Sequence, residues 1–201
     1  MTITLRRLAY PNRLVDSIRY FGRAKEELSM IFNTTVNIIF EQHAHRLNSF
    51  QQPWLSRDQL EMFCDAISEK GSPMSNIFGF IDGTVRPICR PTQHQKICYN
   101  GHKRVHAVKF QSVVVPNGLI ANLYGPMEGK RHDCALLRES NVLETMAEAN
   151  LFKNDGTQMA LYGDQAYVMR PTLYRPFGGV HLNELEQVFN RRMSSVRESV
   201  E

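Results

Sequence analysis

Two aspartates in this 201-residue chain each follow a short apolar run. Asp82 comes after residues 78–81, and Asp164 comes after residues 159–163. Both runs predict buried strands, and a carboxylate at the edge of a core needs a cation or hydrogen-bond donors to replace the hydration it loses. Two strands that both end in an acid predict a shared site at one edge of a sheet. Asp82 before Gly83 also fits the first residue of an ordinary turn.

The segment between Asp82 and a third acid, Asp133, is strongly basic. It carries one acid, Glu128, against eight basic residues, a net charge of +7, whereas the rest of the chain carries 16 basic and 19 acidic residues, a net charge of −3. Cations there would neutralise the phosphates of a phosphodiester substrate while the acids hold divalent metal at the scissile bond. A solvated basic loop is the alternative. The eight are Arg86, Arg90, Lys96, Lys103, Arg104, Lys109, Lys130 and Arg131.

The composition of the chain indicates which class of protein it belongs to. Hydrophobic residues make up 42% of the chain, enough for the core of one ordinary domain and a small second one. No run reaches the length of a membrane span, and the first seven residues lack the apolar core of a signal peptide, so we expect an intracellular protein without a membrane partner. The four cysteines form no CxxC pair, and we expect free thiols.

Residues 1–50 are predicted to form a small helical region. Apolar residues recur at helical spacing on both sides of Gly22, which predicts two helices joined by a turn. This pattern fits a helix-turn-helix that reads DNA, and it equally fits a simple packing unit. Residues 51–76 are predicted to be a connecting helix and linker, with Ser56 as the helix cap.

The rest of the chain, residues 77–201, has a defined order of elements. The strand before Asp82 is followed by an irregular loop at 85–100, and residues 105–115 and 119–124 flank Pro116-Asn117-Gly118 and predict a hairpin. A helix is expected from 133 to 150, then the strand before Asp164 and a last helix that ends at Glu201. This order is similar to that of an RNase H-like fold, an α/β class with a mixed sheet flanked by helices.

Short motifs in the same region carry a resemblance to a known family. Taken together they resemble the DDE superfamily endonuclease domain of Harbinger-type (PIF/Harbinger) transposases and the nucleases domesticated from them, over about residues 77 to 201. The motifs are Phe80-Ile81-Asp82-Gly83-Thr84, Tyr99-Asn100-Gly101-His102-Lys103-Arg104, Gly129-Lys130-Arg131-His132-Asp133, Gly163-Asp164-Gln165-Ala166-Tyr167 and residues 195–201.

The resemblance implies which acids do the chemistry. Asp82, Asp164 and Glu201 would be the catalytic, metal-binding triad, and Asp133 would be a fourth metal-binding acid of the site. Glu198 is the rival for the glutamate, but Glu201 lies four residues after Arg197, where the family places its acid. The family continues its last helix beyond this point, so the domain is expected to be truncated at its C-terminus.

The implied mechanism is cleavage of DNA by two divalent metal ions. Oxygen ligands suit Mg²⁺ or Mn²⁺, whereas zinc is disfavoured because His132 has no second histidine at ligand spacing. Lys103, Arg104 and Arg131 are expected to bind the DNA backbone.

The resemblance also implies partners and a location. DNA would be the substrate, and assembly would involve a separate DNA-binding protein or further copies of the chain. The nucleus is the expected compartment, with the cytoplasm as the alternative. A catalytically inert, domesticated DNA-binding or protein-interaction protein stays open as the alternative function. A small-molecule enzyme is disfavoured, since the sequence has no glycine-rich phosphate loop and no nucleophile elbow.

Overall fold

The structure is a computed structural model that describes residues 1–198. The chain divides into two compact units, residues 1–45 and residues 46 onward. The domain boundaries expected at residues 50 and 76 remain predictions. Glu201, the predicted third acid, lies outside the described residues. No helix in the described part of the chain is long and apolar enough to cross a membrane. The four cysteines are free thiols, as the sequence predicted.

The first unit is helical. It contains α1 (Thr2–Ala9), α2 (Leu14–Phe21) and α3 (Lys25–His43), and both shorter helices contact α3. Gly22 ends α2 with a φ of 62°, a left-handed conformation that glycine adopts without steric cost. The break predicted at Gly22 is therefore confirmed. DNA recognition by this unit stays a prediction.

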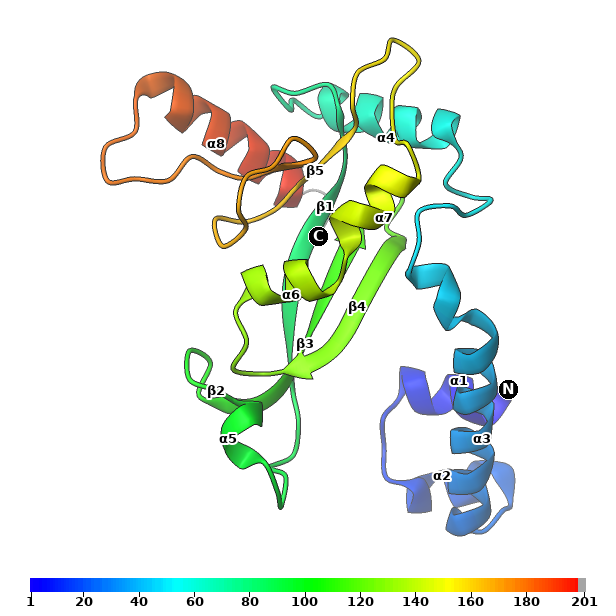
Figure 1. Cartoon of the computed structure of the whole chain (residues 1–201). Helices are drawn as coiled ribbons and strands as arrows, with labels where there is room; N and C mark the ends of the chain where they lie inside the picture. The colour runs from blue at the N-terminus through cyan, green and yellow to red at the C-terminus, as the bar shows by residue number, and fades with distance from the viewer. Residues whose placement is uncertain (199–201) are drawn as a thin grey trace. The chain divides into compact units, whose positions relative to one another are not determined.

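The second unit is built on a mixed sheet of six strands, shown in Figure 1. The long strand β1 (Ile77–Pro87) pairs antiparallel with β3 (Val105–Val114) and parallel with β5 (Ala160–Tyr162). On the outer side of β3 lie β4 (Ile120–Glu128) and the short β2, and β6 extends the sheet beyond β5. The predicted α/β class, an RNase H-like mixed sheet flanked by helices after a helical N-terminal region, is confirmed.

The remaining elements connect and cover these strands. Their bounds are η1 (Ala44–Leu47), α4 (Arg57–Glu69), α5 (Gln95–Cys98), β2 (Tyr99–Asn100), α6 (Asp133–Glu139), α7 (Val142–Glu148), β6 (Leu173–Tyr174) and α8 (Glu184–Glu198). Helix α4 begins as predicted, because the Ser56 hydroxyl accepts a hydrogen bond from the backbone N–H of Gln59.

One hydrophobic cluster lies between the sheet and helices α6 and α7. Ile81 of β1 and Val113 of β3 pack there with Leu137 and Met146. The first part of α4 contributes Leu60 and other residues to the same cluster. This cluster fixes the side of the sheet on which Asp133, the first residue of α6, must lie.

A second cluster lies between the sheet and α8. Phe80 of β1 and Tyr162 of β5 pack there against Met193 and Val196. Phe80 and Ile81 are adjacent but belong to different clusters, as expected where successive strand residues face opposite sides. The same alternation assigns Asp82 to the α8 side and Gly83 to the α6 side.

Three sequence predictions need correction. Asp82 was expected at the end of a strand, but β1 continues to Pro87 because residues 80–87 pair without interruption with β3. The loop expected at 85–100 is thus partly strand, and it also holds α5 and β2. The single helix expected from 133 to 150 is two helices, broken where Asn141 has a φ of 51°. The hairpin of β3 and β4 is confirmed.

Candidate active site

Asp82 lies in the middle of β1 and forms an ion pair with the last helix. It stands opposite Ser112 of β3, and its Oδ1 accepts a hydrogen bond of 2.9 Å from the Arg197 guanidinium of α8. The Asp82 side chain is 44% exposed, whereas that of Arg197 is 20% exposed. The carboxylate is therefore open to solvent while one of its oxygens already has a cationic partner.

Asp164 begins a tight turn directly after β5. Its Oδ1 accepts the backbone N–H of Ala166 at 2.9 Å, and its carbonyl accepts the N–H of Tyr167. Burial raises the pKa of the Asp164 carboxyl, and the charges of Asp133 and Asp82 raise it further, against the opposing effects of the Ala166 N–H and Arg197. The charges of the other two aspartates expected in the site therefore act on Asp164.

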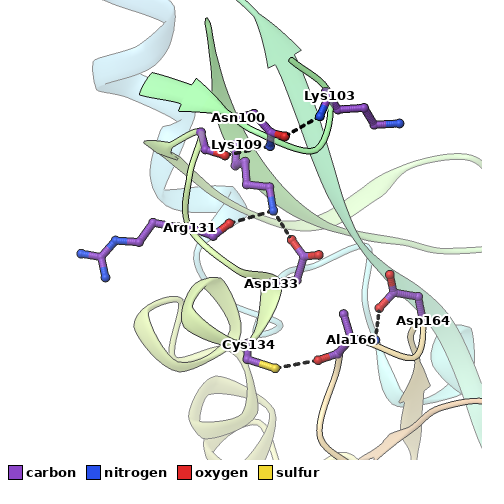
Figure 2. A network of polar contacts seen from close by, with 9 residues as sticks. Asn100, Lys103, Lys109, Arg131, Asp133, Cys134, Asp164 and Ala166 are labelled. Atoms are coloured by element: carbon purple, nitrogen blue, oxygen red, sulfur yellow. Dashed lines mark hydrogen bonds and ion pairs between the residues drawn. The ribbon is translucent and has the colours of Figure 1, made fainter. Parts of the chain in front are cut away.

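Asp133 reaches this region from the N-terminus of α6. Its Oδ1 accepts a hydrogen bond of 2.7 Å from Lys109 Nζ, which also donates to the carbonyl of Arg131 at 2.9 Å (Figure 2). Both side chains are largely enclosed, with 9% of Lys109 and 21% of Asp133 exposed. Lys109 therefore neutralises Asp133 and ties it to the segment that precedes α6.

Gly83 leaves the space that the Asp133 carboxylate fills. A Cβ added at this position would lie 2.5 Å from Asp133 Oδ1, which is closer than any real contact of this kind. The glycine after Asp82 is therefore explained by close packing and not by the turn that the sequence suggested, because β1 continues through Gly83. Since Asp133 lies over Gly83, it approaches β1 from the face opposite to the one that Asp82 occupies.

The carboxylate oxygens of the three aspartates are chemically suitable ligands for a hard divalent cation. The described residues are nevertheless not arranged as a metal site. All three aspartates offer oxygen ligands, and a cation would offset both the burial and the neighbouring charges of Asp133 and Asp82 that raise the pKa of Asp164. Within residues 1–198, however, no group of three or more acidic, histidine or cysteine side chains is placed to hold a metal ion. Lys109 and Arg197 instead compensate two of the acids one by one.

The predicted DNA-backbone residues fall into two classes. Lys103 and Arg104 are exposed in a turn after β2, and neither forms an ion pair with an acid of residues 1–198. Arg131 contacts Glu128 at 3.2 Å and Glu139 at 3.7 Å, so its charge is already compensated. The two exposed cations are thus better placed to bind phosphate than Arg131.

The buried side chain of Asn100 connects the turn that carries Lys103 and Arg104 to the basic segment of residues 129–131. Asn100 donates from Nδ2 to the carbonyl of Gly129, and its Oδ1 accepts the backbone N–H of Lys103, both at 2.8 Å. Figure 2 shows the hydrogen bond from the Lys103 backbone to Asn100, together with the Lys109–Asp133 pair. The turn that carries Lys103 is therefore attached to the segment that leads to Asp133. Nothing in the sequence pattern alone revealed this connection.

Sequence reasoning did not single out Lys109 or Tyr167. Lys109 was one of eight basic residues in its segment, and only the pairing of β3 places it beside Asp133. Tyr167 is fully buried, and its pKa is raised by burial and by the charges of Asp133, Asp164 and Asp82. Its position three residues after Asp164 was the available signal. Glu198, the rival glutamate, is exposed at the end of α8.

A comparison with family models agrees with this arrangement. Residues 81–201 match the model of the DDE superfamily endonuclease. The chain belongs to this family. The match begins one residue before Asp82 and contains every acid of the predicted site. Comparisons with curated proteins and with solved structures gave no significant match. Membership of the DDE superfamily endonucleases supports a nuclease or transposase-derived function, with DNA as the substrate.

Proposed function

We propose that this DDE superfamily endonuclease cleaves DNA phosphodiester bonds with divalent metal held by Asp82, Asp164 and Glu201. The observation that carries the proposal is the match of residues 81–201 to the DDE superfamily endonuclease, which includes all of these acids. In addition, burial and the charges of Asp133 and Asp82 raise the pKa of Asp164. Asp164 of the β5 turn is thus close enough to Asp82 of β1 and Asp133 of α6 for their charges to act on it. Such a concentration of negative charge favours the binding of a cation.

Each residue would have a defined role. Bound Mg²⁺ or Mn²⁺ would supply Lewis acidity, with one ion activating water or a 3′-hydroxyl and the other stabilising the leaving oxygen. Asp82 would exchange its contact with Arg197 for the metal, and Asp164 is held for the same purpose by the Ala166 N–H. Asp133 would be the fourth acid of the family's site, and in the structure it lies over Gly83, with its Oδ1 bound to Lys109 Nζ.

The DNA backbone would be bound by the exposed turn after β2. Lys103 and Arg104 offer charges without acidic partners among the described residues, and Asn100 fixes the backbone of their turn. Arg131 would contribute less, since contact with DNA must compete with Glu128 and Glu139. Phosphate contacts of this kind would position the duplex rather than read its sequence.

The finer identity is also proposed from the motifs. Their order resembles that of Harbinger-type transposases, and this subtype implies nuclear localisation and a separate DNA-binding partner protein, or assembly of several copies. The helical unit of residues 1–45 would be the part of this chain that contacts DNA or that partner.

The test is nicking of supercoiled plasmid by the 201-residue chain with Mg²⁺ or Mn²⁺. Wild type should convert plasmid to the open-circular form with either metal, and excess EDTA should stop the reaction. Asp82→Asn should lose nicking, since an amide is a poor ligand for a hard cation but still accepts the Arg197 hydrogen bond. Asp155→Asn is the matched control, because this exposed acid only caps the turn that ends at Thr157.

One observation favours the alternative of an inert DNA-binding protein. The Arg197 guanidinium binds an oxygen of Asp82 that a metal ion would need. In a domesticated transposase that has lost its activity, such an ion pair would serve only to stabilise the fold. The same assay separates the two functions. DNA binding without nicking in both metals would support the inert protein, whereas nicking that disappears in Asp82→Asn would exclude it.

A further inference from the structure

An asparagine on α8 holds the backbone of the loop that precedes this helix. The Oδ1 atom of Asn190 accepts a hydrogen bond of 2.8 Å from the N–H of Phe177, and its Nδ2 atom donates one of 3.0 Å to the Phe177 carbonyl. A carboxamide carries a donor and an acceptor side by side, so this one side chain satisfies both backbone groups of residue 177. The position of α8 and the path of the loop therefore depend on each other.

The carbonyl of Phe177 also receives a donor from the turn of Asp164. Gln165, the residue after Asp164, donates from Nε2 to this carbonyl at 3.4 Å. The carbonyl of Gln165 in turn accepts a hydrogen bond of 3.0 Å from Arg175 Nη1. The first of these bonds is long and therefore weak, and the second attaches the turn to the same loop more firmly. Residue 177 is thus the point at which the Asp164 turn and α8 meet.

Aromatic packing supports these polar contacts. The Phe177 ring stands edge-on to Phe189 of α8, with 5.1 Å between the ring centroids, and Phe189 contacts Tyr162 of β5 at 6.4 Å. Aromatic pairs at such separations are favourable. Since Tyr162 lies just before the Asp164 turn, the strand, the loop and the helix around this acid all pack against one another.

The later part of α8 contacts the acid site directly. Arg197 lies 197 − 190 = 7 residues after Asn190, or about two helical turns, and donates a hydrogen bond of 2.9 Å to Asp82. Residues two turns apart lie on the same side of a helix. A shift or rotation of α8 at Asn190 would therefore also move Arg197 relative to Asp82.

We propose that Asn190 is a positioning residue, which fixes α8 and the turn of Asp164 relative to each other through the backbone of residue 177. Its effect on cleavage rests on the proposed function, in which acids of this turn and of the sequence at the end of α8 act together. Without the carboxamide, the turn and the helix move independently. Water can replace the two lost hydrogen bonds because Phe177 is 36% exposed, so the fold itself should persist.

Asn183 provides a matched control on the same helix. It directly precedes α8, and its Oδ1 accepts the N–H of Glu186 at 2.9 Å. Its own N–H donates to the Glu186 carboxylate, also at 2.9 Å. This reciprocal pair caps the helix, so Asn183→Ala weakens α8 without removing the bonds to residue 177. A general loss of helix stability would thus appear in both variants, whereas a loss of positioning would appear only in Asn190→Ala.

The experiment measures amide hydrogen exchange of the metal-free full chain in wild type, Asn190→Ala and Asn183→Ala. The N–H groups of Ala166 and Tyr167 bind oxygens of Asp164 and therefore report on its turn. In Asn190→Ala these amides should exchange about tenfold faster, because the segment has lost hydrogen bonds that held it. In Asn183→Ala they should exchange as in wild type. Unchanged exchange in Asn190→Ala, or equal acceleration in both variants, would exclude the positioning role.

Plasmid nicking with Mn²⁺ gives a second readout. In Asn190→Ala kcat should fall by about 10- to 100-fold while KM for plasmid stays the same, and Asn183→Ala should nick as wild type does. Wild-type kcat in Asn190→Ala would overturn the link between positioning and cleavage. If wild type itself does not nick, the proposed function fails, and hydrogen exchange alone still decides whether Asn190 positions the turn.

Discussion

Asp164→Asn should abolish metal-dependent nicking and at the same time stabilise the metal-free protein. Loss of a carboxylate ligand should lower the nicking rate by more than about 100-fold, the upper range for residues that only support ligands. The stabilisation follows from the raised pKa of Asp164, which is caused by burial and by the neighbouring charges of Asp133 and Asp82. An amide removes that repulsion and can still accept the Ala166 N–H.

The stabilisation expected for Asp164→Asn should depend on pH, and the raised pKa fixes the direction of that dependence. A carboxyl whose pKa is raised by folding contributes stability below the ordinary aspartate pKa, and this contribution is lost as the pH rises through the raised value. The melting temperature of metal-free Asp164→Asn should therefore exceed that of wild type by a margin that grows as the pH rises from about 4 through the raised pKa of Asp164. A variant less stable than wild type at neutral pH would contradict the account of the acid site.

Lys109→Met should cost about 3 kcal/mol of folding free energy. The methionine keeps the volume of the lysine stem, but the Asp133 carboxylate loses its cation in a place where only 21% of its side chain is exposed. The Arg131 carbonyl loses its donor as well. Urea unfolding of the wild type and the variant measures this difference in folding free energy. The slopes of free energy against urea concentration should be equal for the two proteins.

The double variant Lys109→Met/Asp133→Asn separates the charge from the packing. It should recover a large part of the loss, because the second change removes the uncompensated charge that the first one creates. If the changes in folding free energy of the two single variants simply add in the double variant, Lys109 and Asp133 do not interact energetically. The attachment of Asp133 through Lys109 would then be wrong.

The arrangement of the second unit could be predicted largely from local patterns. Asp82, Asp133 and Asp164 were each marked by an apolar run or a short motif, and the hairpin of β3 and β4 was marked by its turn residues. Each of these signals is contained in a few consecutive residues, so a single sequence is enough to reveal it. The mixed sheet followed from their order.

The partners of the acids could not be predicted, because they depend on strand register. Lys109 meets Asp133 only through the pairing of β3 with β1, which also carries β1 five residues beyond Asp82. The burial of Tyr167 depends on the turn after β5 and on the space beside Gly163. Asn141 in a left-handed conformation broke a helix whose apolar spacing had favoured continuity.

The most direct test of the metal site is anomalous diffraction from a crystal of the chain grown with Mn²⁺. We expect an anomalous peak within about 2.0–2.6 Å of carboxylate oxygens of both Asp82 and Asp164, with Asp82 released from Arg197. Peaks only at other places, or the Asp82–Arg197 pair intact in saturating Mn²⁺, would contradict the assignment of these aspartates as the metal-binding centre of a DNA endonuclease.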